Sequence, residues 1–215
     1  MLPGFYRACY LALKALFKLV TRWRVRGREN VPNEGPLLIV ANHINLTDPI
    51  LLAVSLDRKV IFMAKKELFS SRFSSFFLRR GLGILPVSRE RMNKEALRQA
   101  NQVLADGQVL GMFPEGTRSK NTQLQPAFPG SALIALRSGV PILPVGISGT
   151  EKIKGITWLL HRPQVTVNIG HPFYPPPIKG KSRKAERTEF TNLMMRHIAE
   201  LLPPEYRGHY GAQGD

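Results

Sequence analysis

Two side chains five residues apart, His43 and Asp48, form the pair in this sequence best suited to act as a general base and its orienting group. They lie in a loop that leaves an apolar run and enters a helix-forming stretch at Pro49. Asp48 can hold one ring nitrogen of His43, which fixes the tautomer and stabilises the imidazolium ion, while the other nitrogen accepts a proton. An aspartate before a proline is also an ordinary helix cap, so the pair alone leaves a purely structural role open.

The sequence offers no nucleophile and no metal site beside this pair. It contains no Gly-x-Ser-x-Gly elbow, and its single cysteine, Cys9, lies far along the chain from His43. The histidines show no helical pairing with a third ligand, so we expect neither a metal ion nor a cofactor. A His–Asp pair without a nucleophile is suited to the direct activation of a substrate hydroxyl.

A second polar loop, residues 113–119, follows another apolar run and reads Phe-Pro-Glu-Gly-Thr-Arg-Ser. Glu115, Thr117 and Arg118 bring a carboxylate, a hydroxyl and a guanidinium onto one tight turn. Gly116 lets the backbone approach a ligand, and the guanidinium of Arg118 has the geometry to hold a phosphate through two hydrogen bonds. An ordinary surface turn with an Arg–Glu pair would have the same composition.

Two further segments accompany these loops. Residues 83–89 run from a strand-like stretch directly into Arg89, which is either a ligand-binding charge or a solvated one. Residues 140–145 contain two prolines and no polar side chain, so we expect a rigid apolar wall there and no chemistry.

In this order and at these separations, the four segments resemble the four sequence blocks of the glycerolipid acyltransferase family. The resemblance is greatest to its 1-acylglycerol-3-phosphate (lysophosphatidate) acyltransferase branch. The matching segments are residues 42–48 for the His-x4-Asp block, 83–89 for the second block, 113–119 for the Pro-Glu-Gly-Thr block and 140–145 for the last. Residues 65–68 and 202–208 also resemble family sequences, so the similarity spans nearly the whole chain.

The resemblance implies an enzyme, a 1-acylglycerol-3-phosphate O-acyltransferase. Such an enzyme moves a fatty acyl group from an acyl thioester to the sn-2 hydroxyl of 1-acyl-sn-glycerol 3-phosphate and produces phosphatidic acid. CoA and acyl-carrier protein end in the same thioester, so either can be the donor. Two alternatives stay open: another acceptor, such as glycerol 3-phosphate or another lysophospholipid, and a non-catalytic basic module that binds membranes.

The resemblance also implies roles for individual residues, with His43 as the general base and Asp48 as the group that orients it. Arg89 and Arg118 would bind the substrate phosphate. The residues expected to bind substrate are Asn42, Lys65, Arg89, Glu115, Gly116, Thr117 and Arg118. The chain departs from the family pattern at Asn45, where many members have Ser, and at Pro129, where a Lys often precedes Gly130.

The charge of the chain indicates polyanionic partners. Its 31 Lys and Arg against 15 Asp and Glu leave a formal net charge of +16. Nucleic acid, an anionic membrane and phosphorylated substrates all fit such an excess. We exclude nucleic acid, because the aromatic residues lie inside apolar runs and no nucleic-acid-binding signature is present. An anionic membrane surface therefore remains as an expected partner, and the resemblance adds the acyl donor, carried by CoA or acyl-carrier protein, and the lysophosphatidate acceptor.

The first 30 residues predict a basic amphipathic helical arm. Its longest uninterrupted apolar run, residues 8–13, is far shorter than the ~20 residues needed to cross a bilayer. We expect the arm to lie in the membrane interface and to hold the protein at the cytoplasmic face of the membrane, as a peripheral or monotopic protein. The alternative is a helix that packs on its own domain. The bases that share one helical face, within about 80° of each other, are Arg7, Lys14, Lys18 and Arg22.

A second segment with interleaved aromatic and basic residues spans residues 69–80. Its phenylalanines fall on one face of a helix, which suits either a second membrane-facing element or a part of the core. The residues in question are Phe69, Phe73, Phe76 and Phe77, with Arg72, Arg79 and Arg80 between and after them.

Alternation of short apolar runs with helical stretches predicts an α/β fold with a largely parallel or mixed sheet flanked by helices. We expect one α/β domain over residues 31–215, preceded by the arm over residues 1–30. The predicted strands are residues 37–41, 60–63, 84–87, 109–113, 142–146 and 165–169. The predicted helices are residues 49–56, 66–78, 92–105, 130–138 and 183–202.

Overall fold

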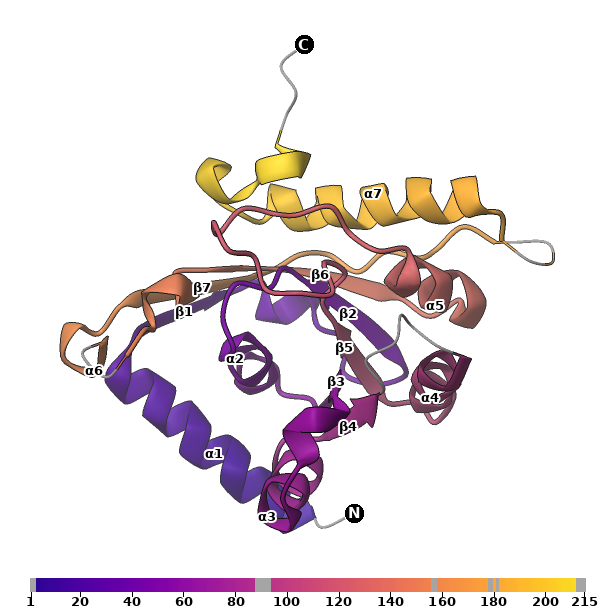
Figure 1. Cartoon of the computed structure of the whole chain (residues 1–215). Helices are drawn as coiled ribbons and strands as arrows, with labels where there is room; N and C mark the ends of the chain where they lie inside the picture. Colours follow the sequence, from indigo (N-terminus) through magenta and orange to yellow (C-terminus); the bar gives the residue numbers. More distant parts are fainter. Residues whose placement is uncertain (1–2, 88–93, 156–157, 178–179, 181, 212–215) are drawn as a thin grey trace.

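A computed structural model of the chain describes residues 3–87, 94–155, 158–177, 180 and 182–211. They form one seven-stranded sheet with helices on both faces (Figure 1). The strands are β1 (Arg22–Arg26), β2 (Leu37–Ala41), β3 (Val60–Lys65), β4 (Ile84–Val87), β5 (Val109–Met112), β6 (Ile142–Ser148) and β7 (Gln164–Ile169). Their order is β1-β7-β6-β2-β5-β3-β4, and all neighbours are parallel except β6 and β7. The prediction of an α/β fold with a mixed sheet is confirmed.

The helices divide between the two faces of the sheet. They are α1 (Pro3–Val20), α2 (Asp48–Ser55), α3 (Arg72–Phe76), α4 (Lys94–Ala105), α5 (Gly130–Ser138), α6 (Trp158–His161) and α7 (Lys184–Glu200). In Figure 1, α1 and α2 lie below the sheet, while α5 and α7 lie above it. Each face has its own buried apolar cluster, one around Leu51 of α2 and the other around Met194 of α7.

Strand β2 is the middle strand of the sheet, and helices cover both of its faces. All five of its residues are completely buried, as the unbroken apolar run requires in a strand between two helical layers. It pairs with β5 on one side and β6 on the other. The three strands run parallel, so the loops after them emerge at the same edge of the sheet.

The expected helix over residues 66–78 is wrong, because the segment is broken into three parts. A 3-10 helix (Lys66–Phe69) comes first, then α3, then a π-helical turn (Phe77–Gly81). Ser70 and Ser71 separate the first two parts, and serine is a weak helix former because its hydroxyl competes for backbone groups. Within this segment Phe69 packs against the core, and Phe76 is half-exposed beside Phe5 of α1. Part of the segment therefore belongs to the core, and its contact with a membrane stays a prediction.

The predicted arm is helical only as far as Val20. Residues 22–26 form the edge strand β1, which pairs with β7. The local sequence Arg-Trp-Arg-Val-Arg alternates polar and apolar residues, and Trp23 and Val25 are half-buried while the arginines are exposed. Part of the predicted arm therefore belongs to the sheet.

Helix α1 packs against the domain along one side and is open along the other. Phe17 and Val20 are buried, and Nζ of Lys14 lies 3.3 Å from Oδ1 of Asp57. The expected basic stripe is therefore divided, because Lys14 turns toward the domain. Three leucines of the open side, Leu11, Leu16 and Leu19, remain exposed. Among the described residues, no helix is both long and apolar enough to pass through a membrane.

Candidate active site

Three loops meet at the edge of the sheet where β2, β5 and β6 end. The loop after β2 carries His43, the loop after β5 carries Glu115, and the loop after β6 contains a 3-10 helix, η4 (Thr150–Lys152). Crevices beyond the carboxyl ends of adjacent parallel strands are the usual place for ligand sites in open α/β sheets. The order β6-β2-β5 places the His43 loop between the other two.

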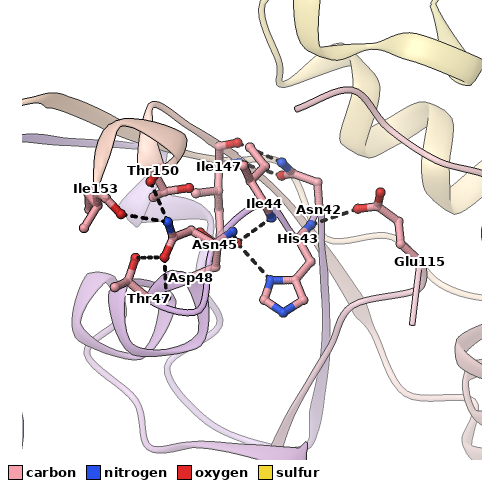
Figure 2. A network of polar contacts seen from close by, with 10 residues as sticks. All are labelled: Asn42, His43, Ile44, Asn45, Thr47, Asp48, Glu115, Ile147, Thr150 and Ile153. Carbon is pink, nitrogen blue, oxygen red and sulfur yellow. Dashed lines mark hydrogen bonds and ion pairs between the residues drawn. The ribbon is translucent and has the colours of Figure 1, made fainter. Parts of the chain in front are cut away.

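The structure brings His43 and Asp48 into direct contact (Figure 2). Nδ1 of His43 lies 2.9 Å from Oδ2 of Asp48, whose side chain is completely buried. The same oxygen accepts hydrogen bonds from the backbone N–H groups of Ile44, at 2.6 Å, and Asn45, at 2.7 Å. Because three donors converge on a carboxylate that can only accept, Nδ1 carries the proton and Nε2 keeps its lone pair.

These contacts decide against the helix-cap reading of Asp48. The N-cap position of α2 is Thr47, and Asp48 is the first residue inside the helix. Its carboxylate accepts from the loop before the helix, at Ile44 and Asn45. Asp48 therefore closes the His43 loop on itself and holds the imidazole at its centre.

Aromatic packing fixes the ring of His43 from one side. The ring stacks on Phe113, with centroids 4.2 Å apart and an interplanar angle of 22°, and Phe113 stacks in turn on Phe62 at 5.9 Å. A Cβ atom on Gly111 would overlap the ring of Phe62, so a larger residue at that position of β5 would have to displace the ring. The side chain of His43 remains 16% exposed, and Figure 2 shows Nε2 on the side of the ring away from Asp48.

Glu115 is buried and holds the backbone of His43. Its residue is 2% exposed, Oε1 accepts from the N–H of His43 at 2.8 Å, and Oε2 accepts from the N–H of Gln125 at 3.0 Å. Burial raises the pKa of this carboxyl, while the two backbone hydrogen bonds oppose the rise. The N–H of Ser119 donates to the carbonyl of His43 at 2.8 Å, so both backbone groups of His43 are held. Glu115 therefore supports the loop of His43, and its contact with substrate stays a prediction.

Asn42 also has a supporting role, and its contact with substrate stays a prediction. Its buried amide donates to the carbonyl of Ile147 at 2.8 Å and accepts from the N–H of the same residue at 2.7 Å, which joins the end of β2 to β6. Asn45 binds the third loop, because its Nδ2 donates to the carbonyls of Thr150, at 2.9 Å, and Ile153, at 3.1 Å. The departure from Ser at position 45 therefore adds contacts between two loops.

The remaining predicted residues lie on the open side of the site or outside the described part of the chain. Gly116 has φ +67°, a conformation that favours glycine, and Thr117 and Arg118 follow it as exposed residues. Arg118 makes no ion pair with any described residue. Lys65 is the last residue of β3, and its side chain and the whole of Arg89 lie outside the described residues.

One supporting residue that the sequence did not reveal, Tyr206, lies near the C-terminus. Its hydroxyl donates to Oε1 of Glu151 at 2.9 Å and accepts from the N–H of Gly149 at 3.2 Å. Burial, followed by the hydrogen bond to Glu151, raises its pKa to about 12. The carbonyl of Tyr206 accepts from the N–H of Leu124, so this residue supports the loops after both β5 and β6. The resemblance of residues 202–208 to family sequences was the one available signal.

The arrangement presents a proton acceptor, Nε2 of His43, at the edge of the sheet. Among the described residues, no group of three or more His, Cys, Asp and Glu side chains is placed to hold a metal ion. Cys9 lies in α1, away from the three loops. The chemistry available at Nε2 of His43 is therefore the removal of a proton from a bound hydroxyl.

Comparisons with known proteins show to which family the chain is related. Residues 22–148, more than half of the chain, match the model of the family described as Acyltransferase. A 1-acyl-sn-glycerol-3-phosphate acyltransferase from Bacillus subtilis (strain 168) is 28% identical over 201 residues, 92% of this chain and 98% of that protein. One from Streptococcus pneumoniae (strain ATCC BAA-255 / R6) is 34% identical over 175 residues, 77% of this chain and 63% of that protein.

A solved structure resembles the chain in three dimensions. It is the crystal structure of the 1-acyl-sn-glycerophosphate (LPA) acyltransferase PlsC from Thermotoga maritima. The TM-score is 0.66 at 31% sequence identity, and the match covers 91% of this chain and 81% of that one. Since the family model matches most of the sheet and the loops that hold His43 and Glu115, this chain belongs to the acyltransferase family.

Proposed function

We propose that the protein transfers a fatty acyl group from an acyl thioester to the sn-2 hydroxyl of 1-acyl-sn-glycerol 3-phosphate. The observation that carries the proposal is the contact of 2.9 Å between His43 and Asp48, which leaves Nε2 as a base at the open side of the ring. The names of the relatives support the choice of acceptor, because the proteins from B. subtilis, S. pneumoniae and T. maritima are all called acyltransferases of this lysolipid.

The reaction balances with His43 as the only proton carrier. The acceptor hydroxyl attacks the thioester carbonyl as Nε2 takes its proton, which forms a tetrahedral oxyanion and an imidazolium ion. Collapse of the intermediate breaks the C–S bond, and the thiolate leaves with the proton from the imidazolium. The buried carboxylate of Asp48 stabilises the imidazolium ion as it forms, because its Oδ2 contacts Nδ1 and is held in place by two backbone N–H groups.

Arginine side chains supply the recognition of the acceptor phosphate in this proposal. Arg118 is exposed on the same loop as Glu115, and the carboxylate of Glu115 holds the backbone N–H of His43. A guanidinium can bind two phosphate oxygens at once, which places the glycerol hydroxyl relative to Nε2. Arg89 and Lys65 stay in the proposal as further phosphate ligands.

The decisive experiment measures thiol release with purified protein and lysophosphatidate, with acyl-CoA and acyl-acyl-carrier protein as donors in parallel. We expect His43→Ala to lose about 10²–10⁴ in kcat with unchanged circular dichroism, as the removal of a general base does. His171→Ala is the matched control, because His171 is exposed and follows the C-terminal end of β7, at the edge of the sheet away from His43. Turnover by His43→Ala equal to that of the control would refute the mechanism. Glycerol 3-phosphate as the acceptor tests the alternative substrate.

The membrane arm also remains a proposal, now confined to the open side of α1. Leu11, Leu16 and Leu19 would enter the acyl boundary of the cytoplasmic leaflet, while Arg7 and Lys18 stay with its anionic headgroups. Deletion of the arm would also remove β1, so surface substitutions are the better test. We expect Leu11→Ser/Leu19→Ser to float less with vesicles than the wild-type protein, with no change in thermal unfolding.

A further inference from the structure

A second surface feature lies at the corner of the molecule where α1 ends. Helix α6, the first residues of β1 and β7, and η4 surround a hollow of about 370 Å³. Figure 1 shows α6 beside the C-terminal end of α1, and the guanidinium of Arg162 donates to the carbonyl of Lys18 at 3.1 Å. The site described above does not use this hollow.

The lining of the hollow is strongly cationic. Arg22, Lys152 and Arg162 all contribute to it and are exposed, and Trp158 forms an aromatic part of the wall. None of the described residues that line it is acidic. The neighbouring Glu151 is engaged elsewhere, because Oε1 accepts the hydroxyl of Tyr206 at 2.9 Å. Three like charges around one hollow repel each other, and a bound anion would relieve that repulsion.

Large apolar side chains stand next to these charges in open solvent. Leu160 of α6 is 85% exposed and Leu159 is 39% exposed. Exposed leucines beside arginine and lysine match the two layers of a membrane interface, with acyl chains below and phosphates above. A soluble anion would explain the charges and leave the leucines without a partner.

The corner lies on the same edge of the sheet as His43. Strand β7 is antiparallel to β6, so β7 and β1 begin where β6 and β2 end. With strands ~4.8 Å apart, the three steps from β2 to β1 span roughly 15 Å. Lys152 belongs to η4, whose neighbouring carbonyls at Thr150 and Ile153 accept the amide of Asn45 in the His43 loop. Contact of this corner with a bilayer would bring the active-site edge to the lipid surface.

We propose that the corner formed by α6, η4 and the start of β1 binds the phosphate headgroups of anionic phospholipids, with Leu160 inserted among their acyl chains. The inference deepens the proposed function, since it names the surface from which a lipid acceptor would be reached. It concerns a contact separate from the leucines of α1, and each contact can be removed without the other.

The first test is flotation of the full chain with vesicles of phosphatidylcholine alone or mixed with phosphatidylglycerol. For Arg22→Gln/Lys152→Gln we expect about 30-fold weaker binding to the anionic vesicles, the effect of removing two charges at such a surface. Lys184→Gln/Arg196→Gln removes the same charge from exposed positions of α7, on the other face of the sheet, and should retain most of the binding. Equal losses in the two double variants would overturn the proposal, because net charge alone would then account for binding.

The second test addresses insertion. Leu160→Ser should weaken binding to the vesicles about tenfold. Tyr174→Ser is the control and should not weaken it, because Tyr174 is also exposed but follows the C-terminal end of β7, away from this corner. The chain has two tryptophans, so Trp23→Phe leaves Trp158 as the only one. Brominated phosphatidylglycerol should quench its fluorescence. Absence of quenching, or an equal effect of the two serine variants, would contradict insertion at this corner.

An activity measurement separates this proposal from the proposed function. With a water-soluble short-chain lysophosphatidate, the Arg22→Gln/Lys152→Gln variant should keep the KM for acyl-CoA of the wild-type protein. A raised KM for acyl-CoA with unchanged flotation would assign the hollow to the phosphates of the donor and overturn the membrane assignment. A chain that binds anionic vesicles through this corner but releases no thiol would retain the membrane site and refute the acyltransferase reaction.

Discussion

Replacing Asp48 by asparagine removes the charge of this residue and keeps its geometry, because a single oxygen, Oδ2, accepts all of its hydrogen bonds. Oδ2 accepts all three hydrogen bonds, from His43, Ile44 and Asn45, whereas Oδ1 is buried without a partner. Two of the donors are backbone N–H groups, so the amide oxygen of asparagine must take the place of Oδ2 and the NH₂ group that of Oδ1. The proton of His43 therefore stays on Nδ1, and the variant loses the charge without a change of tautomer.

The magnitude follows from the distance and the burial of the pair. Opposite charges about 4 Å apart interact by about 4 kcal/mol at the effective dielectric of protein sites, and a neutral hydrogen bond would retain about 1 kcal/mol of that. A net loss of about 3 kcal/mol in the stabilisation of the imidazolium ion lowers kcat by about 10²-fold. The unpartnered NH₂ group should also reduce the free energy of unfolding by about 1–3 kcal/mol.

Steady-state thiol release with saturating donor measures the effect, with urea unfolding as the control for stability. We expect kcat to fall by about 10²-fold while the KM for lysophosphatidate stays within twofold. Nitrogen-15 spectra of the imidazole should show the proton on Nδ1 in both proteins. A loss as deep as that of His43→Ala, together with a proton on Nε2, would refute the orientation argument. Wild-type kcat would refute the role of the charge.

Three further predictions concern the support of His43 and the binding of the acceptor. Burial raises the pKa of Glu115 in the folded protein. The protonated carboxyl therefore contributes to the stability of the fold fully below the usual pKa of 4.5, and this contribution is lost as the pH rises through the folded pKa. Urea unfolding between pH 4 and 7 should show this decline in the wild-type protein and not in Glu115→Gln. Gly111→Ala should displace Phe62 and, through Phe113, the ring of His43. We expect a loss of about 1–3 kcal/mol in the free energy of unfolding and a lower kcat. Gly4→Ala is the control and should change neither quantity, because a Cβ atom at Gly4 has no atom within 4 Å. Arg118→Ala should raise the KM for lysophosphatidate about tenfold and leave that for the donor unchanged, in contrast to the exposed Arg137→Ala on α5; the reverse pattern would assign Arg118 to the donor.

The sequence by itself determined those features that depend on residues close together in the chain. His43 and Asp48 share one short loop, so their spacing alone predicts their contact. Alternation of apolar runs and helical stretches likewise predicts the α/β class, because the period of each element is a local property. Strand β1 has such a local signal in the alternation of Arg, Trp and Val, although the excess of charge in the same residues also fits a basic surface arm.

Tertiary structure decided what each polar side chain of the site does, because its partner comes from a distant part of the chain. Glu115 meets the backbone of His43 across 72 positions, and Asn42 meets Ile147 across 105. Both residue types are equally able to bind a substrate or a backbone N–H group. Only the arrangement of β2, β5 and β6 side by side shows that their polar atoms are buried and occupied. The same holds for Lys14, which a helical projection places in a basic stripe and which the packing of α1 turns toward Asp57.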